Sequence, residues 1–336
     1  MSDVVLSAWR AHRWPMLAWA ALLLVGWAFA PGFIGIELRD GRLFGTPIDI
    51  LDQGSKVAIV ALGMTLVIAT GGVDLSVGAI VALASATVAT LVTNHGVPWP
   101  IAIAGALGVS LVAGAWNGAL VTLLRLQPIV ATLVLMVAGR GIAQLITGGL
   151  IVTVTDPAIA FIGNRSIAAL PTTLWILAIV ATIVGLLTRR TALGLLIEAV
   201  GDGDQASRIA GVPDRAVRFA AYAICGGCAG VAGLIDCSYI KAADVNNAGQ
   251  LIELDAILAV VIGGTALTGG RFSLLGAVIG ALLMQTLTRL LYMLDVSAEI
   301  APAPKALVVL LVCLLHSPRF RASVAQRLKR QPKELA

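Results

Sequence analysis

The sequence predicts an all-α polytopic membrane protein with about ten transmembrane helices, folded as a single transmembrane domain over residues 1–336. Hydrophobic residues make up 59% of the chain and charged residues only 12%, and the mean hydropathy is +0.96. Soluble globular proteins usually carry about 25% charged residues. In addition, polar connections divide the chain into successive apolar runs, and a run of roughly 20 apolar residues crosses a bilayer core as a helix.

Ten apolar runs are the expected spans. Residues 57–70 and 254–268 are the weakest of them because they are short, and each could be broken or re-entrant instead of crossing the membrane completely. Residues 37–55 and 148–171 are expected to be connections between spans. The expected spans are residues 16–33, 57–70, 75–92, 99–124, 129–147, 172–187, 219–240, 254–268, 274–294 and 306–315.

The basic residues favour an orientation with both chain ends in the cytoplasm. Ten spans place the two ends on the same side, and Lys and Arg are concentrated in the segments that would then lie inside, as the positive-inside rule describes. Three cytoplasmic segments follow: residues 1–15, a loop at 189–218 and a basic tail at 319–336. Because these segments explain the net charge of +5, we do not attribute that charge to nucleic-acid binding.

The loop at residues 189–218 is the longest polar interval between apolar runs. Residues 193–200 within it are apolar and predict a short helix, while Gly201 and Gly211 interrupt the loop and Pro213 ends it. A short helix held between two spans on the basic side is suited to docking a soluble partner.

Several polar residues fall inside the expected spans or directly beside them, where a charge is costly and is usually buried within the helix bundle. Asp74, in TGGVDLSVG, is expected either to cap the helix that follows it or to lie in a broken helix that lines a pathway. Arg140 requires an acidic or carbonyl partner, and Asp74 is one candidate. Asn117 and Gln144 are expected to bond neighbouring helices together or to line the pathway.

Two similar glycine-containing segments occur in the two halves of the chain. GGVDLSVGA begins at Gly71 and GGRFSLLGA begins at Gly269. Paired interruptions of this kind often mark a transport pathway, although glycine is common in membrane helices and chance could also produce the similarity. The candidates for the pathway or for a broken helix are therefore Gly71, Gly72, Asp74, Ser76, Asn117, Arg140 and Gln144.

Amide and carboxylate side chains also gather in the outer polar segment that follows residues 219–240. The members are Asp244, Asn246, Asn247 and Gln250, just before Glu253. Such side chains can hydrogen-bond a hydroxyl-rich ligand, but they are also ordinary loop residues.

Several motifs for catalysis and nucleotide binding are absent from the sequence, and their absence narrows the possible functions of the chain. No G-x-x-x-x-G-K-[ST] sequence occurs, so the chain has no P-loop of its own, and any ATP hydrolysis must belong to another subunit. We find no catalytic triad and no metal-binding spacing. Cys225 and Cys228 form a C-x-x-C, but they lie in an Ala/Gly-rich expected span, where small residues at a helix contact explain them better than redox chemistry does. We therefore expect no catalytic residue, no metal and no cofactor on this chain.

Several strings resemble a known family. MTLVIATGGVDLSVGAIVALA at residues 64–84 is similar to the signature of the ribose-type sugar ABC importer permeases of bacterial inner membranes, and the resemblance runs from about residue 14 to residue 319. Four more strings resemble the galactofuranose permeases within this family: DGRLFGTPIDIL (40–51), QPIVATLVLMVAGRGIAQLITGG (127–149), ADVNNAG (243–249) and ELDAILAVVIGG (253–264).

The resemblance implies a type II-like permease that works by alternating access as a homodimer or heterodimer. It implies a partner ATPase that binds ATP and Mg on the cytoplasmic face, and a periplasmic sugar-binding protein outside. In this family the loop at 189–218 carries the coupling helix. The matching residues are Glu198, Ala199, Gly201, Ala206 and Gly211. Asp236 and Lys241 depart from the family pattern, so the sugar itself stays open among pentoses, galactose and galactofuranose.

Two other classes of function remain as alternatives. An ATP-independent secondary transporter or facilitator would need an ion site in the membrane, for which Asp74 and Arg140 are the deep candidates. A membrane enzyme acting on lipid-linked sugars would need clustered carboxylates or a metal motif near an interface, and the sequence shows neither.

Overall fold

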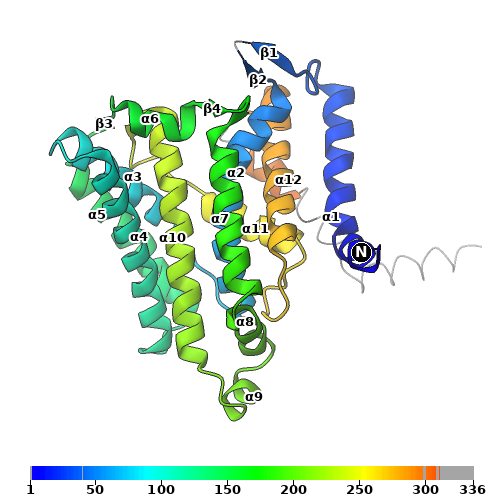
Figure 1. Ribbon diagram of the computed structural model, residues 1–336, viewed down its shortest axis with the longest axis vertical. Coiled ribbons are helices and arrows are strands. Elements are labelled where there is room, and N and C mark those ends of the chain that lie inside the picture. Colours follow the sequence, from blue (N-terminus) through cyan, green and yellow to red (C-terminus); the bar gives the residue numbers. More distant parts are fainter. Residues whose placement is uncertain (1, 40, 298–299, 308–309, 311–336) are drawn as a thin grey trace, which may run out of the picture.

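The protein is a bundle of long helices with short connecting elements at both ends (Figure 1). The computed structural model describes residues 2–39, 41–297, 300–307 and 310. In chain order, its elements are α1 (Ser2–Phe29), β1 (Glu37–Arg39), β2 (Arg42–Phe44), α2 (Thr46–Ala69), α3 (Val77–Thr93), α4 (Trp99–Thr122), α5 (Pro128–Thr147), β3 (Val152–Thr153), α6 (Pro157–Asn164), β4 (Ser166–Ile167), β5 (Leu170–Pro171), α7 (Thr172–Arg189), α8 (Leu193–Asp202), α9 (Asp204–Ile209), α10 (Asp214–Ile240), β6 (Ala242–Ala243), α11 (Ile252–Ile262) and α12 (Leu274–Met293).

Six of the described helices are long and apolar enough to cross a membrane: α2, α4, α5, α7, α10 and α12. Pro15–Phe29 within α1 and Val77–Thr93 (α3) are apolar but shorter. The weak expected span at 254–268 corresponds to α11, which has only 11 residues and is too short to cross a bilayer core by itself. Most of the expected span at 306–315 lies outside the described residues. The described part of the chain is thus polytopic and helical, with six span-length helices.

The expected connection at residues 37–55 is in large part helical, so that prediction was wrong. Helix α2 begins at Thr46, with Pro47 in its first turn, and continues without a break to Ala69. The first half of α2 can be helical within the bundle, although it is polar, because its polar side chains have partners on other helices. Asp49 accepts a hydrogen bond from Arg289 of α12 at 2.6 Å, and Lys56 pairs with Asp236 of α10 at 2.5 Å. The second expected span is therefore a 24-residue helix.

Two segments without regular structure adjoin short helices inside the bundle. Residues 70–76 connect α2 to α3, and residues 244–251 lead into α11. Gly249 packs so closely against Gly78 at the start of α3 that a Cβ on either glycine would crowd the backbone of the other. The two interrupted segments therefore meet within the bundle, which is the arrangement of discontinuous helices in many transporters.

Small residues bring α10 close to its neighbours. Gly226 of α10 faces Gly114 of α4, and a Cβ at either position would lie within 3 Å of the other backbone. Cys225 and Cys228 are buried free thiols that pack against Gly63 of α2. The C-x-x-C thus lies at a helix contact, as small residues at membrane-helix interfaces do.

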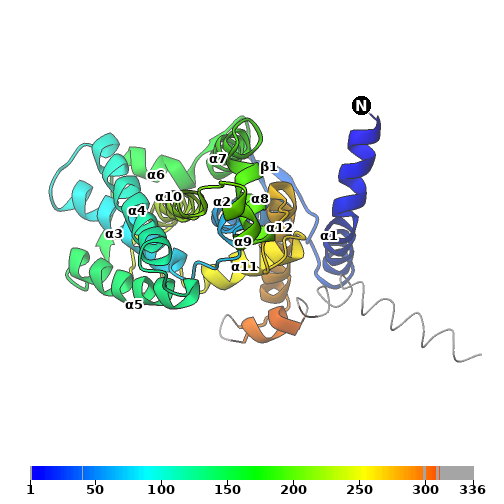
Figure 2. The same cartoon turned by 90° about the horizontal axis from the view of Figure 1, so that it is seen from below.

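The two ends of the bundle differ. Figure 1 shows α8 and α9 together at one end and β1, β2, α6 and β4 at the opposite end. Helix α8 covers the short helix expected at residues 193–200. Strand β3 pairs with β6 and joins the connection after α5 to the segment after α10. Figure 2 shows α1 at the edge of the molecule beside α12, where the Trp19 indole N–H donates to Thr286 at 2.9 Å.

Candidate functional site

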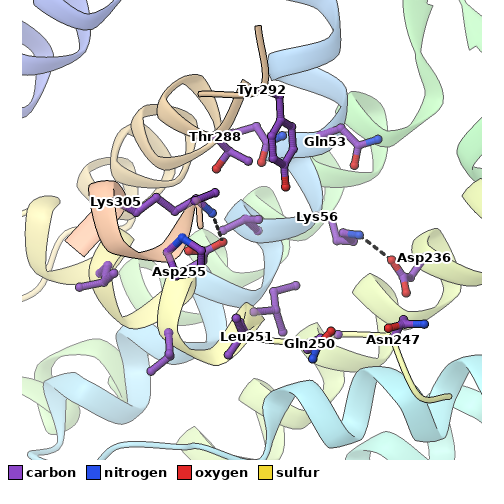
Figure 3. A pocket seen from close by; sticks show the side chains of 18 of the residues that line it. Gln53, Lys56, Asp236, Asn247, Gln250, Leu251, Asp255, Thr288, Tyr292 and Lys305 are labelled. Atoms are coloured by element: carbon purple, nitrogen blue, oxygen red, sulfur yellow. Dashed lines mark hydrogen bonds and ion pairs between the residues drawn. The ribbon is translucent and has the colours of Figure 1, made fainter. Parts of the chain in front are cut away.

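A polar cavity of about 430 Å³ lies between α2, α10, α11 and α12 (Figure 3). Its size falls in the range typical of small-molecule sites. Its polar lining residues are Gln53, Lys56, Asp236, Asn247, Gln250, Asp255, Gln285, Thr288, Tyr292 and Lys305.

The charged groups of the polar cavity occur as pairs. The Lys56 Nζ lies 2.5 Å from the Asp236 carboxylate, and the Lys305 Nζ lies 3.4 Å from that of Asp255. All four side chains are at most about a quarter exposed, so each charge needs its partner. Because two lysines are matched by two aspartates, the lining combines balanced charge with many hydrogen-bonding groups. This lining suits an uncharged, hydroxyl-rich ligand better than an ion.

Helix α11 begins at the wall of the polar cavity. Leu251, with φ of 60°, reverses the chain immediately before the helix, and Leu251, Ile252 and Asp255 all line the cavity. The first-turn amides of a helix have no partners within the helix. At the start of α11, the Ile252 amide donates to the Gly249 carbonyl and the Leu254 amide to that of Leu251, so this turn brings the carboxylate of Asp255, and no free amide, to the cavity.

A second polar group, separate from the cavity, forms where α3 begins. The fully buried Asp74 accepts hydrogen bonds from the Ser76 amide at 2.9 Å and from the Ser76 hydroxyl at 2.6 Å. The Asn117 amide of α4 donates to the Ser76 hydroxyl at 2.7 Å. Tyr222 of α10 covers Gly72. Asp74 thus holds the turn that precedes α3, and Asn117 fixes this turn to α4.

Arg140 has carbonyl partners, and not Asp74, among the described residues. Its guanidinium donates to the carbonyl oxygens of Ala248 at 3.2 Å and of Gly249 at 3.4 Å. Arg140 therefore has carbonyl oxygens as its hydrogen-bond partners, and Glu253, which also lies beside Gly78, is an acidic neighbour that it acts on electrostatically. Arg140 holds the interrupted segment before α11 against α5 and beside Gly78 of α3.

The outer polar segment lies beside the same part of α5. Gln144 donates to the Asn246 side chain at 3.0 Å, and Asp244 accepts from the Asn246 amide and from the Asn247 side chain. Glu253 is buried, and its carboxylate lies against Gly78. Of this segment's predicted polar residues, Asn247 and Gln250 line the polar cavity.

Four glycines from distant parts of the sequence meet near the end of the bundle that carries α8. Gly71, Gly201, Gly269 and Gly270, here called the glycine node, join the end of α2, the end of α8 and the connection before α12. The Gly270 amide donates to the Ala69 carbonyl at 2.9 Å. A Cβ at Gly201 would overlap both the Ala69 carbonyl oxygen and the Gly270 nitrogen. Only glycine permits this approach.

The remaining residues predicted for partner docking lie on α8, on α9 and just beyond α9. Glu198 and Ala199 are half-buried, whereas Ala206 and Gly211 are exposed. Large apolar side chains accompany them on the surface, because Ile209 is 89% and Leu195 is 73% exposed. This end of the bundle therefore presents apolar surface outside the long helices.

Most of the polar cavity could not be predicted from the sequence, because its residues come from four helices, and from segments beside them, that are distant in the chain. One signal was available: Gln53 and Lys56, with Asp49 and Asp52, share one polar side of the segment that forms α2. Asp236 was noted as unusual, but the sequence did not indicate that Lys56 is its partner. Among the described residues, no group of His, Cys, Asp and Glu is arranged to hold a metal ion.

Comparison with known proteins identifies the family. Residues 46–316 match the family described as branched-chain amino acid transport system / permease component. The chain is 50% identical over 316 residues to the galactofuranose transporter permease protein YtfT of Escherichia coli (strain K12), covering 93% of this chain and 92% of that protein.

Two further relatives are sugar import permeases. The chain is 38% identical to the fructose import permease protein FruF of Bifidobacterium longum (strain NCC 2705), over 95% of this chain and 90% of the relative. It is 36% identical to the ribose import permease protein RbsC of E. coli K12, over 93% of this chain and 96% of the relative. No solved structure matches this chain.

Proposed function

The chain belongs to the family described as branched-chain amino acid transport system / permease component, and from this premise we propose that it is the membrane-spanning subunit of an ABC importer for galactofuranose. The relative at 50% identity is named for galactofuranose, and those at 38% and 36% are named for fructose and ribose. These relatives cover at least nine-tenths of the chain. They therefore favour a monosaccharide over an amino acid as the substrate.

The observation that carries this proposal is the polar cavity. Three of the helices around it, α2, α10 and α12, are long enough to cross a membrane. Its lining carries amides, hydroxyls and balanced charges beside apolar side chains such as Val57, Leu254 and Leu258. A neutral sugar loses hydrogen bonds to water when it enters the membrane, and these lining groups can replace them. An amino acid would instead need uncompensated groups for its own two charges.

The proposed mechanism is alternating access driven by a partner ATPase. As a permease component the chain is not itself the ATPase, so ATP and Mg would bind the partner. Helix α8 would receive the ATPase movement, and Glu198, Ala199, Gly201, Ala206 and Gly211 would belong to the docking region. The glycine node would pass the movement to the ends of α2 and of the connection before α12. A periplasmic sugar-binding protein and a second permease subunit would complete the importer in the bacterial inner membrane.

The proposed topology has ten crossings with both ends in the cytoplasm. Residues 70–76 with α3, and residues 241–251 with α11, would each make one crossing from a coil and a short helix. This interpretation places α8 and α9 inside and α6 outside, at the opposite ends seen in Figure 1. Non-helical backbone at membrane depth is tolerated where protein surrounds it, and Asp74, Ser76, Asn117 and Arg140 supply the required hydrogen bonds.

Cysteine accessibility tests the cavity and the sugar together. Gln250→Cys places a thiol in the polar cavity, whereas Asn94→Cys places one in an exposed connection outside it. We expect a water-soluble thiol reagent to modify both variants and galactofuranose to protect only Gln250→Cys. Protection by ribose or fructose but not by galactofuranose would show that galactofuranose is not the transported sugar. Equal modification of both variants in the presence of every sugar would show that the cavity is not part of the transport pathway.

A further inference from the structure

A second concave site lies beside α6 and β4, at the end of the bundle opposite α8 and α9 (Figure 1). Its volume is about 690 Å³, and it is formed by β2, the start of α4, α6 and the start of β4. We call it the outer pocket, because the proposed topology places this end of the bundle outside. Its polar lining residues are Arg42, Trp99, Arg165 and Ser166.

The polar groups of the outer pocket are hydrogen-bond donors that the protein leaves unused. Arg42 and Arg165 carry guanidinium groups, Trp99 an indole N–H and Ser166 a hydroxyl. None of these four side chains has a hydrogen bond or an ion pair within the described residues, and no carboxylate lines the pocket in that part of the chain. Asp156, at the start of α6, is occupied, because its carboxylate accepts from the first amides of that helix at 2.8 and 3.3 Å. The outer pocket therefore suits a ligand that is negative and rich in acceptors.

The fold brings the two arginines together from distant segments. The Leu43 amide of β2 donates to the Ala169 carbonyl between β4 and β5 at 3.1 Å, which holds the two hairpins side by side. The exposed carboxylate of Glu37 on β1 pairs with Arg39 instead. The positive-inside rule concentrates basic residues on the cytoplasmic side, so it does not explain two arginines in a pocket on the outer side. Two guanidinium charges that share one pocket repel each other unless an anion lies between them.

An apolar stripe leads away from the outer pocket along α4. Trp99 and Ile103 line the pocket, and Leu107 and Leu111 follow on the same side of the helix, each four residues further along. Trp99 and Leu111 are 47% and 46% exposed. Tryptophan is typical of the level at which lipid headgroups meet acyl chains. Unused donors and an apolar stripe therefore meet at one membrane interface.

We propose that the outer pocket binds an anionic phospholipid of the outer leaflet, the leaflet following from the proposed topology. Arg42 and Arg165 donate to the phosphodiester, because guanidinium groups match phosphate oxygens in pairs of parallel hydrogen bonds. Trp99 and Ser166 add two neutral donors, and an acyl chain covers the stripe on α4. A zwitterionic headgroup fits less well, since its ammonium group would lie beside two arginines and would find no carboxylate in the described lining.

The test compares two double variants that remove the same charge. Arg42→Gln with Arg165→Gln changes the outer pocket, whereas Arg39→Gln with Lys241→Gln removes two basic residues outside it at the same end of the bundle. The full-length chain is placed in phosphatidylcholine nanodiscs with increasing shares of phosphatidylglycerol, and retained phosphatidylglycerol is counted by native mass spectrometry. Thermal unfolding in phosphatidylcholine alone shows whether each variant is folded, and its shift on addition of inorganic phosphate measures binding of the free ion.

The pocket variant should retain phosphatidylglycerol about tenfold or more weakly, whereas the control variant should retain it like the unchanged chain. Trp99→Phe, which keeps a ring and loses only the N–H, should show a smaller loss, and this variant carries the test if the double variant does not fold. Equal loss in both double variants would overturn the proposal, because general charge would then explain the binding.

Two further results would contradict a lipid site. A stabilising shift with inorganic phosphate as large as that with phosphatidylglycerol would show that no lipid is required. Unchanged lipid retention in the pocket variant, with loss of the periplasmic sugar-binding protein, would assign the arginines to carboxylates of that partner. Neither result depends on which sugar the chain transports, so the lipid site can fail while the proposed function stands.

Discussion

At the scale of single residues, Lys56 and Asp236 show how two charges are accommodated between long apolar helices. Their side chains are 24% and 13% exposed and lie 2.5 Å apart between α2 and α10. Lys56 also acts electrostatically on Asp52, but its 2.5 Å contact is with Asp236. The pair therefore links two long helices and lines the polar cavity at the same time.

A double-mutant cycle measures this pair. We expect Lys56→Met and Asp236→Leu each to lower the thermal stability of the purified permease. Each substitution leaves the other, largely buried charge without the partner that lies 2.5 Å away. The double variant should be more stable than the sum of the single effects predicts, by about 1–3 kcal/mol of coupling. Exchanging the charges, with Lys56→Asp and Asp236→Lys, should recover part of the loss. Additive single effects would show that the pair contributes nothing as a pair.

Arg140 is expected to hold the interrupted segment before α11. Each charge-assisted hydrogen bond to a carbonyl contributes about 1.5–3 kcal/mol, so Arg140→Met should destabilise residues 245–249 and reduce transport. Hydrogen exchange of that segment should rise in Arg140→Met and change less in Arg140→Lys, which keeps the charge but not the planar fork. Unchanged exchange in Arg140→Met would mean that packing alone holds the segment.

At the scale of elements, helix α8 is joined to the bundle through Gly201. We expect Gly201→Ala to push α8 away from Ala69 and Gly270, since its Cβ has no space there. Sugar-stimulated ATPase activity of the assembled importer should fall by an order of magnitude or more, an estimate based on a contact displacement of about 1 Å. The matched control is Gly203→Ala in the same loop, where a Cβ would meet only Ala206 at ordinary contact distance.

The resemblance assigns Gly201 to the loop that carries the coupling helix, and the structure shows that the contacts of Gly201 itself are with α2 and with the connection before α12. Unchanged sugar-stimulated ATPase activity in Gly201→Ala would therefore show that the glycine node does not transmit the movement of α8. It would leave the docking role of exposed residues such as Ala206 and Ile209 untouched.

The sequence predicted elements well where hydropathy alone decides them. The runs at 99–124, 129–147 and 274–294 correspond closely to α4, α5 and α12. It failed for the start of α2, because Asp49, Asp52 and Lys56 are typical of a connection unless their partners on distant helices are known. Similarly, the polar cavity depends on which faces of four helices meet, and one sequence without the fold does not contain that information.

At the scale of the whole molecule, a single bundle combines the cavity, the interrupted segments and the α8–α9 end. The polar cavity lies between α2, α10, α11 and α12, and the ends of α2 and of the connection before α12 meet α8 at the glycine node. Movement of α8 would therefore act on the ends of elements that enclose the cavity. This connection is what an ATP-driven permease requires and what a passive facilitator does not.

The most direct measurement is galactofuranose uptake into proteoliposomes that contain this chain with its ATPase and sugar-binding partners, compared with the same chain alone. We predict uptake that needs both partners and hydrolysable ATP, and that disappears when a non-hydrolysable analogue replaces ATP. Comparable uptake by the chain alone, driven only by the sugar gradient, would contradict the account and would identify the protein as an ATP-independent carrier.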